Sequence, residues 1–354
     1  MKKNYFMLAA ATMLFAACAE TDVLVDVSEK ESAPQEISFD AFANKATRAE
    51  ITDLSDLQEN TVGFQVWGYK YPSTDQNVVW NDVKEGDVIT TAKNYFTVFD
   101  GVDVTYANSA WGYGNDKQYW DKTSKYNFYA VAPKEGSYSI TDGKIKITNI
   151  ASAKSDESAD YLIDRDGATL IDGGATTKSP VAFQFNHIMA KLSFVLQAGV
   201  SEDITVTSLT MTGWNGNTGI FTQDLTTTPR VADDVTEWGF TNDTSLPGTI
   251  TLVGVNATNE TLVLPNTKQA VNVSDKYIMV PQSIAANTLT FTITYSIGLE
   301  TFTAQVGQVK EAQVWGTDSH TTYTITVGPE EISFNTTHSV GGWTNSDTGS
   351  TAIQ

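Results

Sequence analysis

The stretch Leu289-Thr-Phe-Thr-Ile-Thr-Tyr-Ser-Ile297 places apolar side chains at every second position and hydroxyl-bearing side chains between them. Successive side chains of a β-strand point to opposite faces, so this alternation predicts a half-buried antiparallel strand. The same pattern returns at 322–327. Two shorter alternating runs, 138–140 and 145–147, flank an Asp-Gly pair, which is typical of a tight β-hairpin.

The rest of the chain contains many short strand signals separated by Gly, Asn, Asp and Pro. Further strands are predicted at 62–69, 181–185, 191–197, 203–211, 261–264 and 276–280. The glycines at 213, 216 and 219 open no helix and predict a loop. Outside the first residues no long segment has helical periodicity. These features predict an all-β fold of antiparallel β-sandwiches, and 354 residues are enough for two in tandem.

The first 48 residues have a different character. Residues 1–17 combine two lysines with a short apolar stretch and small residues, which predicts an export signal. Cys18 is the only cysteine and follows directly, an arrangement that resembles the lipobox of bacterial lipoproteins. The alternative is a plain secretory signal that ends near a cysteine. Residues 18–48 are polar and predict a leader or tether.

The remaining chain divides into three predicted parts. Residues 49–190 form a first sandwich, residues 191–330 a second, and residues 331–354 a C-terminal tail. The boundary is placed near 187–200, where the apolar stretch 181–196 can end one domain and begin the next.

Charge excludes one class of partner. The chain has 22 Lys and Arg against 42 Asp and Glu, a formal charge of −20, and its only arginines are Arg48, Arg165 and Arg230. A protein that binds phosphates needs clustered cations, so nucleic acid is not an expected partner. The same charge would repel an anionic lipid surface, so attachment to a membrane would have to be covalent or by insertion.

Catalytic residues are scarce. The three histidines, His187, His320 and His338, lie far apart, and His187 sits in an apolar strand context that favours a hydrogen-bonded structural role. The acids around 156–166 lack the spacing of a calcium loop and predict a solvated loop. No motif predicts an enzyme, a metal site or a cofactor.

An aromatic cluster leaves two interpretations open. Trp111, Tyr113 and Trp120 could stack on sugars if exposed, giving a glycan contact, or could be part of the core. The core is favoured because Tyr126 and Phe128 nearby alternate as a strand with an apolar face.

Four motifs in order carry a family resemblance. They are Glu36-Ile-Ser-Phe-Asp-Ala-Phe-Ala-Asn-Lys-Ala-Thr-Arg48, Tyr126-Asn-Phe-Tyr-Ala-Val-Ala-Pro133, Phe185-Asn-His-Ile-Met-Ala-Lys-Leu192, and the ending from Tyr323 through Phe334 to Trp343. Together they resemble the fimbrillin family of pilus subunits from Bacteroides-type bacteria. The resemblance implies two transthyretin-like β-sandwich domains, export as a lipoprotein and polymerisation after an Arg-specific protease removes the leader.

Carried onto this chain, the resemblance implies lipidation of Cys18 and cleavage between Arg48 and Ala49. The lipid on Cys18 would hold the precursor at the outer membrane, and the mature protein would be part of a fimbrium at the cell surface. Other fimbrial subunits and the Arg-specific protease are the implied partners, with host or bacterial surface glycans or proteins as adhesion targets.

Two pentapeptides connect the leader with the tail. Residues 36–40 read Glu-Ile-Ser-Phe-Asp and residues 331–335 read Glu-Ile-Ser-Phe-Asn, so they differ at one position. If the leader fills a groove before cleavage, the tail of another subunit could bring Ile332 and Phe334 to the same pockets, with Trp343 as a later anchor. The competing hypothesis is a surface lipoprotein or tip adhesin that does not polymerise and binds glycans.

Overall fold

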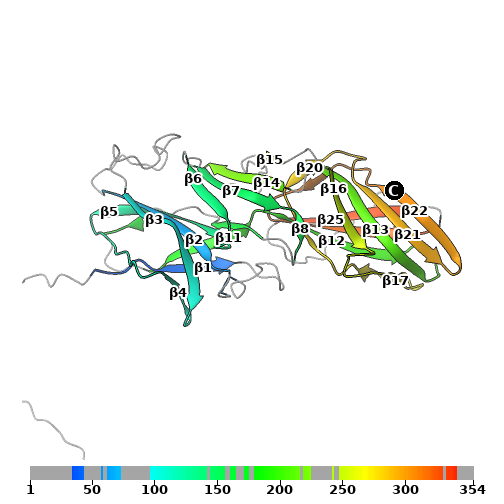
Figure 1. Ribbon diagram of the computed structural model, residues 1–354, viewed down its shortest axis with the longest axis horizontal. Helices are drawn as coiled ribbons and strands as arrows, with labels where there is room; N and C mark the ends of the chain where they lie inside the picture. Colours follow the sequence, from blue (N-terminus) through cyan, green and yellow to red (C-terminus); the bar gives the residue numbers. More distant parts are fainter. Residues whose placement is uncertain are drawn as a thin grey trace, which may run out of the picture. The chain divides into compact units, whose positions relative to one another are not determined.

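A computed structural model describes residues 34–43, 57–58, 62–72, 96–141, 144–155, 160–164, 171–174, 179–215, 218–224, 241–242, 247–329 and 332–340. From Gln35 onward the chain forms one compact unit. Strands dominate the described residues, so the predicted all-β class is confirmed (Figure 1). Within them, no helix has the length and apolar character needed to span a bilayer.

The N-terminal half is built on an eight-stranded sheet with the order β1-β11-β9-β5-β2-β3-β4, in which β10 also pairs with β5. Its strands are β1 Phe39–Ala43, β2 Phe64–Pro72, β3 Phe96–Ala107, β4 Ala110–Tyr113, β5 Ser124–Ala132, β9 Leu162–Asp164, β10 Ile171–Asp172 and β11 Val181–His187. The ring of Phe39 on the first strand in this order contacts the ring of Tyr113 on the last strand, which shows that the sheet curls.

This sheet is buried on both faces. Along β5, Tyr126, Phe128 and Ala130 point into one core, while Tyr129 and Val131 point into another. The second core lies against a four-stranded sheet with the order β15-β14-β7-β6. Its strands are β6 Ser137–Thr141, β7 Lys144–Ala151, β14 Thr218–Asp224 and β15 Thr241–Asn242. The nearly continuous apolar run of β5 is therefore explained by burial of both faces of its sheet.

The C-terminal half is a sandwich of two sheets. One has the order β25-β24-β12-β19-β8 with β18 beside β12, and the other has the order β16-β13-β21-β22 with β17 beside β13. The first contains β8 Ala153–Lys154, β12 Ala190–Ala198, β18 Val271–Asn272, β19 Tyr277–Met279, β24 Ser319–Val327 and β25 Ile332–Val340. The second contains β13 Ile204–Asn215, β16 Pro247–Val253, β17 Leu262–Leu264, β21 Thr290–Ile297 and β22 Glu300–Gln308. A separate pair joins β20 Gln282–Ile284 to β23 Gln313–Trp315.

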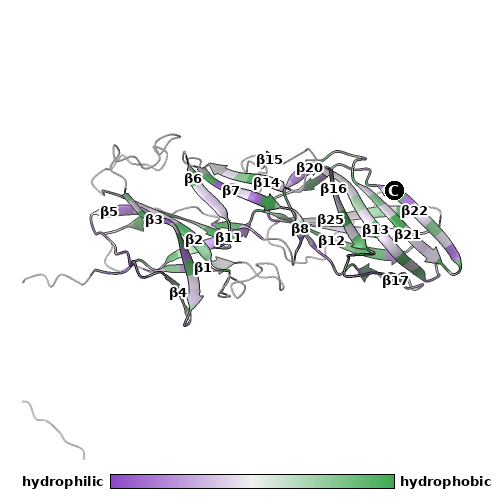
Figure 2. Ribbon diagram, in the orientation of Figure 1, coloured by the Kyte–Doolittle hydropathy of each residue, from purple (hydrophilic) through white to green (hydrophobic). Residues whose placement is uncertain are grey.

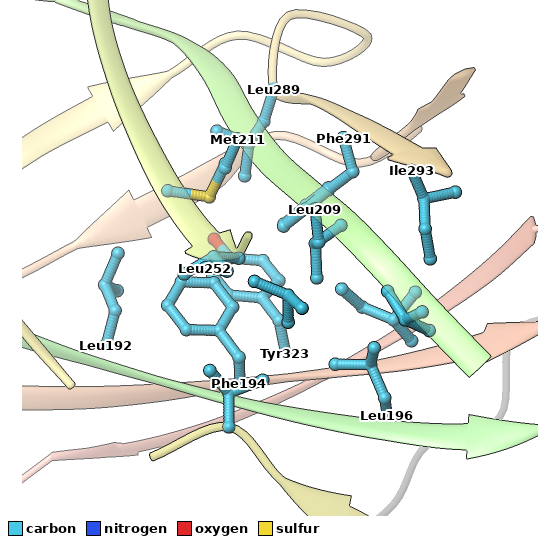
Figure 3. Packing of buried hydrophobic residues seen from close by; sticks show 14 of the residues in the cluster. Leu192, Phe194, Leu196, Leu209, Met211, Leu252, Leu289, Phe291, Ile293 and Tyr323 are labelled. Atoms are coloured by element: carbon cyan, nitrogen blue, oxygen red, sulfur yellow. The ribbon is translucent and has the colours of Figure 1, made fainter. Parts of the chain in front are cut away.

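The core of this sandwich is filled by alternate residues of facing strands. Figure 3 shows Phe194 of β12, Phe291 of β21 and Tyr323 of β24 pointing toward one another. The ring centroids of Phe194 and Tyr323 lie 5.7 Å apart. Figure 2 shows apolar and polar positions mixed along the same strands, as the alternation of 289–297 predicts.

Two sequence expectations need correction. The sheets are not purely antiparallel, because β1 pairs with β11 and β12 pairs with β24 in parallel. Gly213 and Gly219 lie in strands rather than in a loop. Gly213 has φ of 99°, and a Cβ there would collide with the backbone carbonyl of Thr288. Two pairings also join segments from before and after residue 190: β14 pairs with β7, and β8 pairs with β19.

Candidate functional site

Residues 35–43, which we call the leader strand because they fall in the predicted leader, contribute a strand to the core of the N-terminal half. Ile37, Phe39 and Ala41 alternate along the segment and are 0%, 4% and 0% exposed. The side chains between them, on Ser38 and Asp40, are only partly buried. The segment thus follows strand periodicity, and the face that carries Ile37, Phe39 and Ala41 packs in the core.

Phe39 is the centre of an aromatic pocket. Its ring centroid lies 5.2 Å from that of Phe99, 5.6 Å from Tyr113, 5.9 Å from Phe128 and 5.8 Å from Phe183. These four residues come from β3, β4, β5 and β11. The Phe39 ring therefore contacts strands that lie far apart in the order of the curled sheet.

The backbone of the leader is hydrogen-bonded on both sides. On one side β1 runs parallel to β11, and the amide of Val181 donates to the Ser38 carbonyl at 2.8 Å. On the other side the Ile37 amide donates to the Gln118 carbonyl at 2.8 Å, and the Trp120 amide donates to the Gln35 carbonyl at 2.9 Å. We call the space between β11 and residues 118–120 the leader groove, which residues 35–43 fill in this structure.

The C-terminal half also has an early strand with a parallel partner. There β12 pairs in parallel with β24 on one side and antiparallel with β19 on the other. Both halves therefore pair an early strand in parallel with a strand from later in the same half. In the C-terminal half that strand is continuous with the domain, whereas in the N-terminal half it is the leader.

The loop from Tyr113 to Trp120 forms one wall of the leader groove. The Tyr113 hydroxyl donates to the Ile37 carbonyl at 2.9 Å and accepts the Gln118 amide at 3.1 Å. Burial raises the pKa of Tyr113. Lys117 forms an ion pair with Glu36, with 2.9 Å between Nζ and Oε1, and the hydrogen bond that Lys117 donates to Glu36 raises the pKa of the lysine.

The aromatic residues considered for glycan contact belong to this wall and to the core. Tyr113 and Trp120 are 8% and 7% exposed. Trp111 is half-buried, with its ring centroid 4.9 Å from Phe64 and 5.2 Å from Tyr106. The structure thus places the rings of Tyr113 and Trp120 where the core interpretation put them, with little surface available for stacking on a sugar.

The tail residues Ile332 and Phe334 lie on β25, which pairs antiparallel with β24 at the edge of its sheet. Phe334 stacks on Phe291 with 5.1 Å between ring centroids. It also covers Gly307 of β22, where a Cβ would lie 2.5 Å from the ring. Both tail residues are only half-buried, and a pocket of about 400 Å³ lies beside Ile332, lined also by Tyr295, Val306 and Pro329.

The other residues named from the sequence are the histidines and four residues near the ends of the chain. His187 is buried, with Nδ1 2.9 Å from the carboxylate of Asp160, which agrees with its predicted structural role. His320 lies 2.8 Å from the Ser193 hydroxyl on the neighbouring strand. No cluster of three or more His, Cys, Asp and Glu suited to a metal ion occurs in the described part of the chain. Cys18, Arg48, Ala49 and Trp343 lie outside the described residues.

The fold and the filled groove define an all-β protein in which a leader strand completes the core of the N-terminal half. The chain belongs to the fimbrillin-like family, whose sequence model matches residues 47–343. The match begins just after the leader strand. No curated protein matches the chain.

The chain is similar to solved structures of fimbrial proteins, and the first of them supports the fold. A fimbrial protein from Bacteroides vulgatus aligns with a TM-score of 0.59 at 17% identity, covering 88% of this chain and 100% of the other. The tip fimbrial protein Mfa3 from Porphyromonas gingivalis aligns with a TM-score of 0.37 at 12% identity, covering 86% and 98%. A fimbrial assembly protein from Parabacteroides distasonis gives 0.37 at 9% identity, covering 85% and 95%.

Proposed function

We propose that this chain is a structural subunit of a surface fimbria and that it polymerises by strand exchange at the leader groove. One observation carries the proposal: a leader strand that begins Glu-Ile-Ser-Phe is buried in the N-terminal half and hydrogen-bonded on both sides, and the tail repeats the same four residues. The role is structural, with no enzymatic step of its own.

Loss of the leader would leave the groove in a costly state. Burial of a large apolar side chain contributes about 1.5–3 kcal/mol, so Ile37 and Phe39 together contribute roughly 3–6 kcal/mol. Backbone groups on β11 and on residues 118–120 would lose their partners as well. This sum is comparable with the whole stability of a typical domain, so an emptied groove favours any strand that can fill it.

The tail of another copy is the occupant that fits. Ile332 and Phe334 have the spacing of Ile37 and Phe39, so they would reach the same two pockets. In their own sheet they are half-buried, whereas the leader residues in the groove are almost fully buried. Transfer of the tail to the groove would therefore bury more apolar surface, which gives the exchange a direction.

Processing would control when the exchange begins. We propose that residues 1–17 are an export signal, that Cys18 carries the lipid that holds the precursor at the outer membrane, and that an Arg-specific protease cuts between Arg48 and Ala49. A covalently attached leader competes with a free tail at a very high effective concentration. Cleavage removes that advantage and permits exchange. We also propose two transthyretin-like domains that meet near residue 190, with β14 returning to the first.

The test treats recombinant residues 19–354 with an Arg-specific protease, followed by N-terminal sequencing and an unheated denaturing gel. A new start at Ala49 together with a heat-sensitive ladder is the expected result, because kinetically trapped β-polymers resist detergent at low temperature. A product cut at Ala49 that remains a monomer would overturn the polymerisation proposal and favour a tip adhesin or a surface lipoprotein that does not polymerise.

A further inference from the structure

The leader groove ends in a charged contact as well as in apolar pockets. Glu36 precedes the buried Ile37 directly, and its carboxylate meets the ammonium group of Lys117 at 2.9 Å. The tail carries an acid at the equivalent position, Glu331, directly before Ile332. Lys117 therefore faces a position that is acidic in both the leader and the tail.

Lys117 also has contacts within its own loop, besides its ion pair with Glu36. Its Nζ lies 3.4 Å from the Tyr113 carbonyl oxygen and 4.6 Å from the centroid of the Tyr113 ring, a cation–π geometry. The Lys117 amide donates to the Asn115 carbonyl at 3.0 Å. The Tyr113 hydroxyl in turn binds both the Gln118 amide and the carbonyl of Ile37. One short loop thus contacts the backbone of the bound strand and the acid that precedes it.

Apolar pockets by themselves discriminate poorly between strand registers. A slip by one residue turns the apolar side chains outward, but a slip by two keeps the inward face and moves each side chain to the next pocket. Such a slip would carry the acid about 7 Å along the strand, beyond the reach of a salt bridge. A cation fixed at the mouth of the groove favours the one register in which the acid lies beside it.

We propose that Lys117, supported by Tyr113, forms an acid-binding subsite that selects the incoming donor strand and sets its register by pairing with Glu331 of another copy of this chain. This inference rests on the proposed function, because it names the contact by which the tail would be recognised. The subsite fits a strand of the form acid, Ile, any residue, Phe.

The experiment uses the only cysteine of the chain. Recombinant residues 18–354 with Arg165→Lys and Arg230→Lys carry a fluorophore on Cys18 and are then cut after Arg48, so that the labelled fragment 18–48 is retained only through the groove. Synthetic peptides of residues 329–344 are added in excess, and release of the leader is followed as a fall in anisotropy. The peptides are the native sequence, Glu331→Lys, and the matched control Glu330→Lys.

The native and Glu330→Lys peptides are expected to release the leader with similar efficiency. The Glu331→Lys peptide should be weaker by roughly fivefold, the upper range for an exposed ion pair. In a Lys117→Glu protein the preference should reverse, so that Glu331→Lys becomes the better competitor. The differences should shrink in 1 M salt, where exposed charges are screened within about 3 Å.

Two results would overturn the inference, and they are distinguishable. If the native peptide releases the leader but Glu331→Lys and Glu330→Lys behave alike in both proteins, strand exchange stands and the subsite is wrong. If no peptide releases the leader, strand exchange at this groove is refuted, and the subsite with it.

Discussion

Phe39→Ala is the substitution that most directly tests whether the leader strand holds the N-terminal half together. The Phe39 side chain is 4% exposed and contacts four aromatic rings from β3, β4, β5 and β11. Truncation of a buried Phe to Ala removes apolar contacts and leaves a cavity, at a cost of about 3–5 kcal/mol. The sheet around the pocket limits how far the cavity can collapse, so we expect the free energy of unfolding to fall by at least about 3 kcal/mol.

The assay is native-state hydrogen exchange by mass spectrometry on the uncut protein. The amides of β11, which pair directly with the leader, report its release. A loss of about 3 kcal/mol corresponds to an increase of roughly a hundredfold in their exchange rates. Ser38→Ala is the matched control, because Ser38 points away from the pocket and its contact with β11 is made by the backbone carbonyl.

The comparison has a clear negative outcome. If the β11 amides of Phe39→Ala exchange at rates within about threefold of those in the native protein, the leader does not stabilise this sheet. Strand exchange would then lack its driving force. An equal acceleration in Ser38→Ala would point to a general effect of substitution in the leader, and would likewise refute the reasoning.

Three further predictions concern the packing of the tail on β22, the Tyr295 hydroxyl and the Asp121 carboxylate. Gly307→Ala places a methyl group 2.5 Å from the Phe334 ring, so we expect the free energy of unfolding to fall by about 1–3 kcal/mol. Hydrogen exchange should become faster in β25 and stay unchanged in β11. Unchanged exchange in β25 would contradict the packing of the tail. Tyr295→Phe removes a buried hydroxyl that donates to the Gly328 carbonyl at 2.6 Å, directly after β24 ends at Val327. The substitution should lower the free energy of unfolding by about 1 kcal/mol in a guanidinium titration, whereas an unchanged midpoint would show that this bond contributes nothing. Hydrogen bonds from the side chain and then the amide of Thr123 lower the pKa of Asp121 from 3.8 to about 2. A depressed pKa in the folded state means that the carboxylate stabilises the fold above pH 3.8 and loses this effect as the pH falls through about 2, so the Tm difference between native protein and Asp121→Asn should be larger at pH 6 than at pH 2.

Much of the strand content was predictable because it depends on local patterns. The alternation at 289–297 became β21, and the runs at 138–140 and 145–147 became the paired strands β6 and β7. Buried and exposed faces alternate along a strand, so the period of the sequence records the strand directly. The structural role of His187 followed in the same way from its apolar neighbours.

Other features could not be predicted from local patterns. The strand β14 was missed because the glycines at 213, 216 and 219 look like loop residues, and its partner β7 lies some 70 residues earlier in the chain. Sequence also left open whether Trp111, Tyr113 and Trp120 were surface or core. Their placement depends on the curling of the sheet around Phe39, which brings two distant edges together.

The sequence by itself determined the strand periodicity, the all-β class and the repeated Glu-Ile-Ser-Phe at 36–39 and 331–334, because each of these is written in neighbouring residues. Only the tertiary structure decided that β1 lies parallel to β11, that the first copy of the repeat is buried in one half, and that the second copy is half-buried at a sheet edge in the other. The physical reason is that pairing partners are chosen by long-range packing and by backbone hydrogen bonds, which carry no signature in the local sequence.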